Sequence, residues 1–201
     1  MQKPATTEHA VHALIQDRWS PRAFSAKPIP SQLLRSLFEA ARWAPSSSNE
    51  QPWAFLAATK DDQDTYAKLL STLVPFNQTW AQSAPVLAVA ISELAFAKSG
   101  QPNRNAFYDT GAAVSQLTTE ATSRGVFVHQ MGGFEPDKVV ELFNVPNGWQ
   151  PIAAIAIGFP GDPETLPEQL KQRELAARER KPLAEIVMGA KWGEPASFLR
   201  K

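Results

Sequence analysis

The sequence predicts one domain that mixes helices with buried strands, in the α/β or the α+β class. Its 201 residues suit a single domain, and 43% of them are apolar, which is enough to build a core. Stretches with helical spacing of apolar residues alternate along the chain with short runs of strand type. The 17 prolines fall between these stretches and mark their ends. We therefore treat residues 1–201 as one domain, in which the Pro- and Gly-interrupted residues 181–201 form an extended C-terminal arm.

The first half of the chain contains one predicted helix and two predicted strands. Ser31 follows a proline as a candidate N-cap, and apolar residues then recur at helical spacing, which predicts an amphipathic helix over 31–43. Residues 53–58 and 86–91 are short apolar runs that each follow a proline. Their length and composition are typical of buried strands, so we expect both in one sheet.

The second half is centred on a predicted buried helix over 109–124. Small and apolar residues on one face, such as Ala113 and Leu117, would let it approach its neighbours closely, and Gly125 is a candidate C-terminal glycine. The remaining predicted elements are a strand at 126–129, a turn at 131–133, a helix at 136–143, a strand at 152–157 and a charged helix at 170–180.

Charge and composition argue against several classes of function. Lys and Arg together number 20, as do Asp and Glu, so no field of one sign attracts nucleic acid or anionic lipid. With no cysteine and only three histidines, a metal site is not expected. The longest apolar stretch, 84–91, is far shorter than the roughly 18 residues of a membrane-spanning helix. The polar residues 1–9 lack the apolar region of a signal peptide, so we expect a cytoplasmic protein.

Two basic clusters are candidate anion sites. Arg18-Trp19-Ser20-Pro21-Arg22 places two guanidinium groups and a hydroxyl within five residues, and these groups can pair with phosphate oxygens. Arg178-Glu179-Arg180-Lys181 is a second cluster, at the end of the last predicted helix. Each cluster has a plainer interpretation: the first as a solvated turn, the second as cations that offset the helix dipole.

A polar loop and a pair of glycines are candidate contacts for a flat ligand. The loop Pro45-Ser46-Ser47-Ser48-Asn49-Glu50-Gln51-Pro52 carries three hydroxyls and two carboxamides, and Asn49 and Gln51 could read the polar edge of a heterocycle. Gly132-Gly133 would let the backbone approach a flat ligand with no side chain in the way. The alternatives are an ordinary polar loop and an ordinary turn between a strand and a helix.

Other polar residues are interpreted as structural. Asp109 stands at the start of a predicted helix and suits a cap, while His129 suits a core or turn position. The acidic residues Asp61, Asp62 and Asp64 lack the spacing of a metal-binding loop. No arrangement of Ser, His and Asp points to nucleophilic catalysis.

Four motifs occur in order along the chain: Arg18-x-Ser20-x-Arg22-x-Phe24, Ala44-Pro45-Ser46-Ser47-Ser48-Asn49-x-Gln51-Pro52-Trp53, Gly132-Gly133-Phe134 and Arg178-x-Arg180-Lys181-Pro182-Leu183. Taken together, over about residues 18–192, they resemble the nitroreductase family of flavin mononucleotide (FMN) enzymes. The resemblance implies the α+β class, with a mostly antiparallel central sheet wrapped by helices. It also implies a homodimer that holds two flavins at the subunit interface and is joined by the C-terminal arm.

The resemblance also implies which residues hold the cofactor. The implied phosphate contacts are Arg18, Ser20, Arg178 and Arg180, with Trp19 and Arg22 in the same site and Arg22 near the polar edge of the ring. The implied contacts around the ring are Pro45, Ser46, Ser47 and Asn49 from the partner subunit, together with Gln51, Asn77, Gln130, Met131, Gly132 and Gly133. No side chain is expected to act as a catalytic residue, because the flavin carries the redox chemistry.

The activity that the resemblance implies is FMN-dependent oxidoreduction. A hydride would pass from NADH or NADPH through the flavin to a small planar acceptor, such as a nitroaromatic compound or a quinone, by a ping-pong route. Some relatives carry an acidic residue at the position of Gly132 and a lysine near Trp80, and both are missing here, which leaves the acceptor and the nicotinamide open. The alternatives are a flavin-binding protein that sequesters or cleaves flavin, and a flavin-free dimeric scaffold.

Overall fold

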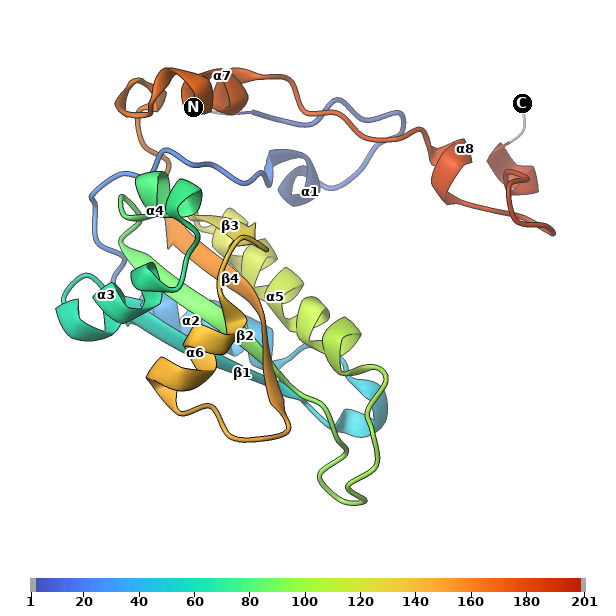
Figure 1. The fold of residues 1–201 in the computed structure, drawn as a ribbon. Helices are drawn as coiled ribbons and strands as arrows, with labels where there is room; N and C mark the ends of the chain where they lie inside the picture. Colours follow the sequence, from blue (N-terminus) through green and yellow to red (C-terminus); the bar gives the residue numbers. More distant parts are fainter. Residues whose placement is uncertain (1–2, 200–201) are drawn as a thin grey trace.

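A four-stranded antiparallel sheet forms the centre of the computed structural model, which describes residues 3–199 (Figure 1). The strands are β1 (Trp53–Thr59), β2 (Val86–Glu93), β3 (Phe127–Met131) and β4 (Trp149–Gly158). Their spatial order is β1-β2-β4-β3, and each neighbouring pair is antiparallel. The α+β class and the four strands are confirmed, although Met131 ends β3 instead of opening the turn.

The central strand β2 is buried on both sides, which explains its continuous apolar sequence. Leu87 and Val89 point into one hydrophobic cluster, and Ala88 and Ala90 point into a second cluster on the opposite side of the sheet. Successive side chains of a strand alternate between its faces, so both faces need apolar residues here. Helices must therefore cover the sheet on both sides.

One face is covered by two helices, α2 (Ser31–Arg42) and α5 (Ala106–Ser123) (Figure 1). Leu37 of α2 and Leu117 of α5 are fully buried in the cluster between these helices and the sheet. The buried central helix is confirmed and begins three residues earlier than expected. The N-cap of α2 is Pro30, with no side-chain cap, so the assignment of Ser31 as the cap was wrong.

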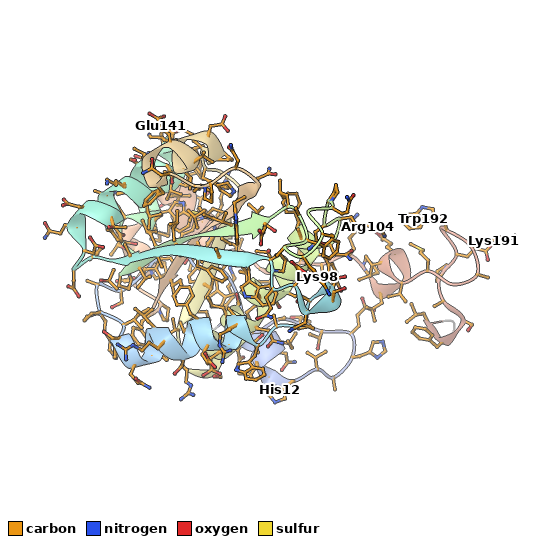
Figure 2. The ribbon with its side chains drawn as sticks, turned by 90° about the horizontal axis from the view of Figure 1, so that it is seen from below. His12, Lys98, Arg104, Glu141, Lys191 and Trp192 are labelled. Atoms are coloured by element: carbon orange, nitrogen blue, oxygen red, sulfur yellow. The ribbon has the colours of Figure 1, made fainter. Side chains whose placement is uncertain are left out.

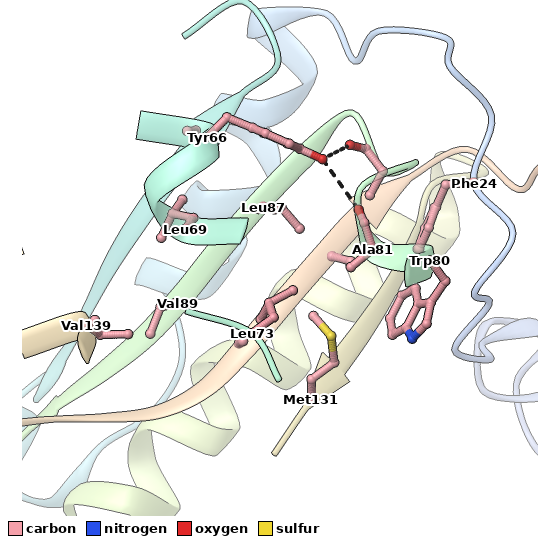
Figure 3. Close-up of a cluster of buried hydrophobic side chains, with 14 of the residues drawn as sticks. Phe24, Tyr66, Leu69, Leu73, Trp80, Ala81, Leu87, Val89, Met131 and Val139 are labelled. Atoms are coloured by element: carbon pink, nitrogen blue, oxygen red, sulfur yellow. Dashed lines mark hydrogen bonds between the residues drawn. The ribbon is translucent and has the colours of Figure 1, made fainter. Parts of the chain in front are cut away.

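The opposite face is covered by α3 (Gln63–Ser71), α4 (Pro75–Ala81) and α6 (Pro136–Phe143). Of these three helices, only α6 was predicted from the sequence. Asp62 belongs to the acidic run and caps α3 by accepting from the Thr65 backbone N–H at 3.2 Å. The Tyr66 hydroxyl donates to the Ala84 carbonyl at 2.6 Å and also reaches the Ala81 carbonyl at 3.4 Å (Figure 3). These bonds fix α3 against the chain that enters β2.

The two ends of the chain run side by side along one end of the sheet (Figure 1). They contain α1 (Ala13–Asp17), α7 (Glu168–Leu175), α8 (Leu183–Ile186) and two short 3-10 turns, at Pro163–Thr165 and Ser197–Leu199. Another 3-10 turn, Ser47–Asn49, lies between α2 and β1. The helix expected over 170–180 thus ends at Leu175. Residues 181–199 leave the body as an arm, which carries α8 and a bridge between Met188 and Pro195, and its tip holds Trp192 (Figure 2). Among the helices of residues 3–199, none has both the length and the apolar character needed to cross a bilayer.

Candidate functional site

The two basic clusters meet in one cavity of about 260 Å³ at the end of the sheet. Arg18, Trp19, Ser20 and Arg22 come from the chain that follows α1, and Arg178 and Arg180 come from the chain that follows α7. The cavity is lined by six cationic side chains: Lys3, Arg18, Arg22, Arg173, Arg178 and Arg180. Two carboxylates, those of Glu174 and Glu179, line it as well. Lys3, Arg173 and Glu174 also line the cavity but could not be predicted, because no motif in the sequence connects them to the site.

The cations of this cavity are crowded. Burial lowers the pKa of the Arg18 guanidinium, and the positive charges of Arg178 and Arg180 lower it further. Burial likewise lowers the pKa of Arg178, and the charge of Arg180 adds to that effect. An anion bound among these groups would offset their mutual repulsion, as a phosphate does.

Arg178 also ties the two ends of the chain together. Its guanidinium donates to the Lys3 carbonyl at 2.9 Å and to the Gln16 carbonyl at 2.6 Å. Arg178 and Arg180 lie beyond Leu175, where α7 ends, so the interpretation of this cluster as compensation of a helix dipole was wrong. Both side chains line the cavity, and that of Arg178 also bonds the N-terminal part of the chain.

Some hydrogen-bond donors that line the cavity have no partner within the described chain. The Arg18 guanidinium donates to the Ser20 hydroxyl at 3.3 Å, which leaves other N–H groups of the same guanidinium free of intramolecular bonds in the described chain. The indole Nε1 of Trp19 is buried and has no hydrogen-bond partner among the described residues. An orphaned buried donor next to a crowded set of cations fits a ligand rich in acceptor atoms.

The polar loop after α2 lies apart from this cavity, because none of its residues lines it. Ser48, Asn49 and Gln51 all have left-handed backbone angles, with φ of 56°, 56° and 54°. The Gln51 backbone N–H donates to the Ser46 hydroxyl at 3.0 Å, which stabilises the strained turn. Strain of this kind persists where surrounding contacts determine the conformation, and it is frequent at functional sites.

Asp109 holds the loop in place. It is a buried residue inside α5 whose carboxylate accepts from the Ser47 backbone N–H at 3.0 Å, so the assignment of Asp109 as a helix cap was wrong. The exposed aromatic side chains of Phe107 and Tyr108 precede it on the same helix. One chain therefore presents the polar loop and two exposed aromatic rings next to each other, and away from its own basic cavity.

The glycine pair and Asn77 are in direct contact. The Asn77 carboxamide donates to the Gly133 carbonyl at 2.9 Å, and the Val74 backbone N–H donates to the same carbonyl at 3.2 Å. A Cβ at position 133 would lie 2.6 Å from the Asn77 Nδ2 atom, whereas a Cβ at Gly132 would meet no atom within 4 Å. A side chain at position 133 would therefore displace the Asn77 carboxamide from its bond to the Gly133 carbonyl, whereas the surface at Gly132 is open.

His129 links this segment to the first basic cluster. Its Nδ1 atom lies 2.8 Å from the Pro21 carbonyl, which can only accept, so Nδ1 carries the proton. Its ring lies against Trp80, with centroids 4.5 Å apart. Burial lowers the pKa of His129 to about 4, so the imidazole is neutral near pH 7. Of the core and turn positions expected for His129, these contacts fit the first, because the residue lies within β3 and not in a turn.

Comparison with known proteins identifies the family. The family model described as the nitroreductase family matches residues 15–159. The chain belongs to the nitroreductase family. This nitroreductase-family match covers the first basic cluster, the polar loop and the glycine pair, and it ends before Arg178 and Arg180.

Individual relatives extend the comparison. A solved structure described as an oxidoreductase containing FMN is 37% identical, has a TM-score of 0.88 and covers 93% of this chain and 95% of its own. An uncharacterized 15.4 kDa protein of Mycolicibacterium smegmatis is 36% identical over 67% of this chain and 90% of the relative. The FMN reductase (NAD(P)H) of Bacillus subtilis is 24% identical over 82% of this chain and 72% of the relative.

Proposed function

We propose that the protein passes two electrons from NADH or NADPH to small planar acceptors, such as nitroaromatic compounds or quinones, by a ping-pong route. It is an FMN-dependent oxidoreductase of the nitroreductase family. The observation that carries the proposal is the cavity in which the two basic clusters meet. Its crowded guanidinium groups suit the phosphate of FMN, because a phosphate accepts several charge-assisted hydrogen bonds at once.

The residues of this chain then divide into two groups. Arg18, Ser20, Arg178 and Arg180 bind the phosphate, and Asn77 with the segment 130–133 lies against the ring. When bound, FMN supplies the redox chemistry by accepting a hydride from the nicotinamide and giving it to the acceptor. The protein contributes binding and orientation.

A second copy of the chain completes the site. The loop Pro45–Asn49 does not line the basic cavity of its own chain, so its contacts with a flavin would be made across a dimer. Exposed aromatic side chains support such an association: Tyr108 next to the loop is 81% exposed, and Trp192 on the arm is 93% exposed. Aromatic residues of this kind are enriched at protein interfaces.

The absorbance spectrum and its response to nicotinamide test the function. Purified protein supplied with FMN should be yellow after dialysis, and NADH or NADPH should bleach it under nitrogen. Double-reciprocal plots at several acceptor concentrations should be parallel, and intersecting lines would indicate a ternary complex instead. A loaded flavin that neither nicotinamide bleaches would favour flavin sequestration or cleavage, and a colourless protein would refute the cofactor.

Sedimentation tests the contribution of the second copy. At micromolar concentration the flavin absorbance should travel with a dimer, and dilution into monomers should release the flavin. A monomer that retains flavin would contradict the assignment of Pro45–Asn49 to the partner's site.

A further inference from the structure

Glu174 is a buried carboxylate inside a cavity built for an anion. Its side chain is 1% exposed, and it lies in the last turn of α7. One carboxylate oxygen accepts from the backbone N–H groups of Arg22, at 2.9 Å, and of Ala23, at 3.0 Å. The other oxygen lies 3.0 Å from the same Arg22 nitrogen and 4.0 Å from its guanidinium. The hydrogen bonds of Glu174 are thus made mainly to backbone, across the two halves of the cavity.

The backbone of Glu174 adds a third connection. Its carbonyl accepts from the Lys3 ammonium group at 2.5 Å, and Lys3 also lines the cavity. One residue therefore contacts the N-terminal segment and the segment after α1, and it is only four positions before Arg178. Within residues 3–199 no strand pairing joins the segments that carry the two basic clusters, so these contacts, together with the bond from Arg178 to the Gln16 carbonyl, determine the separation of the clusters.

A negative charge at this place is unfavourable for phosphate binding by itself. It weakens the field of the surrounding cations, and its burial costs desolvation energy that only good hydrogen bonds offset. A carboxylate that served electrostatics alone would be better absent from such a cavity. The contribution of Glu174 to the geometry of the cavity must therefore outweigh its unfavourable electrostatic effect.

We propose that Glu174 is the positioning residue that joins the two halves of the phosphate cavity. By holding the backbone of Arg22 and Ala23 against the end of α7, it brings Arg18 and Ser20 within reach of the anion that Arg178 and Arg180 also bind. This inference rests on the proposed binding of FMN through its phosphate. It adds a residue that does not itself touch the cofactor.

Two substitutions separate geometry from charge. In Glu174→Gln the side chain keeps its size, but either orientation of the carboxamide places an NH2 group against the Arg22 N–H, because both oxygens lie within 3.0 Å of that nitrogen. In Glu174→Asp the charge is kept, but the side chain is one methylene too short to hold both backbone groups. Glu168→Gln is the matched control, because Glu168 is exposed on the same helix and, among the described residues, its side chain bonds only that of Gln172.

The measurement is the dissociation constant of the flavin-free protein for FMN and for riboflavin, which lacks the phosphate. We expect both variants at position 174 to bind FMN about ten- to a hundredfold more weakly than the wild type, because misplaced cations lose charge-assisted bonds. The dissociation constant for riboflavin should stay within about threefold of the wild-type value, because a threefold change corresponds to less free energy than one ordinary hydrogen bond. Glu168→Gln should bind both flavins as the wild type does.

Each other outcome overturns the inference. Tighter FMN binding by Glu174→Gln with unchanged binding by Glu174→Asp would mean that Glu174 acts only through its charge. An equal loss of FMN and riboflavin in both variants, or a loss of folded structure in both, would mean a general structural role. A wild-type protein that binds riboflavin as tightly as FMN, or binds neither, would instead refute the proposed phosphate site itself.

Discussion

His129 should make the stability of the protein depend on pH in a way that can be calculated. Burial lowers its pKa from 6.5 to about 4 in the folded state, whereas the unfolded chain keeps the ordinary value. As the pH falls, the unfolded state therefore takes up a proton first, so the stabilisation is complete above about pH 6.5 and is lost progressively toward pH 4. At about 1.4 kcal/mol for each pKa unit, the loss by pH 4 is about 3 kcal/mol.

Urea unfolding at a fixed protein concentration, followed by circular dichroism between pH 7.5 and pH 4, measures this effect. His129→Asn removes the titration and can keep a donor toward the Pro21 carbonyl, so the gap in unfolding free energy between wild type and variant should shift by about 3 kcal/mol over that range. His12→Asn is the control, because His12 lies exposed at the surface and only caps the short helix α1 (Figure 2). An identical pH dependence of wild type and His129→Asn would refute the reasoning.

Three further substitutions test the site and the fold. Arg18→Ala should weaken FMN binding about ten- to a hundredfold, as dialysis against a series of FMN concentrations would show, and full retention of flavin would contradict the phosphate assignment. Gly132→Leu should leave the melting temperature of the flavin-free protein unchanged, since no atom lies within 4 Å of its added Cβ, yet it should block turnover if the segment covers the flavin. Unchanged turnover would mean that another segment covers it. Tyr66→Phe should lower the free energy of unfolding by about 1–3 kcal/mol, because the Ala84 carbonyl loses its 2.6 Å hydrogen bond, and a urea titration that shows no loss would disprove this.

The strands and the central helix could be predicted because their apolar residues repeat clearly. The helices α3 and α4 could not, for reasons visible in their sequences. Tyr66 and Leu69 are the only buried residues of α3, and α4 is seven residues long and opens with Pro75. Such short segments form helices because the sheet beneath them is apolar, and tertiary packing of this kind leaves little periodic pattern.

The candidate site shows the same division. Arg18, Ser20, Arg178 and Arg180 could be identified from residue type, and the structure brings all four to one cavity. Neither Glu174 nor Lys3 could be found in this way, because their importance lies in contacts with parts of the chain that are distant in sequence. For Asp109 the local pattern pointed to the wrong role, since its partner is the loop after α2 and not its own helix.

The segment from Arg18 to Phe24 forms no helix or longer strand of its own, so its order must come from its neighbours. His129 holds it from the side of the sheet through the Pro21 carbonyl, and Glu174 holds it from α7 through the next two backbone N–H groups. The His129 bond uses a neutral ring and the Glu174 bonds use a buried carboxylate, so neither adds a positive charge to the crowded guanidinium groups. An irregular segment can in this way present Arg18 and Ser20 in a defined place, because its own backbone polar groups are satisfied by elements that the hydrophobic core already fixes.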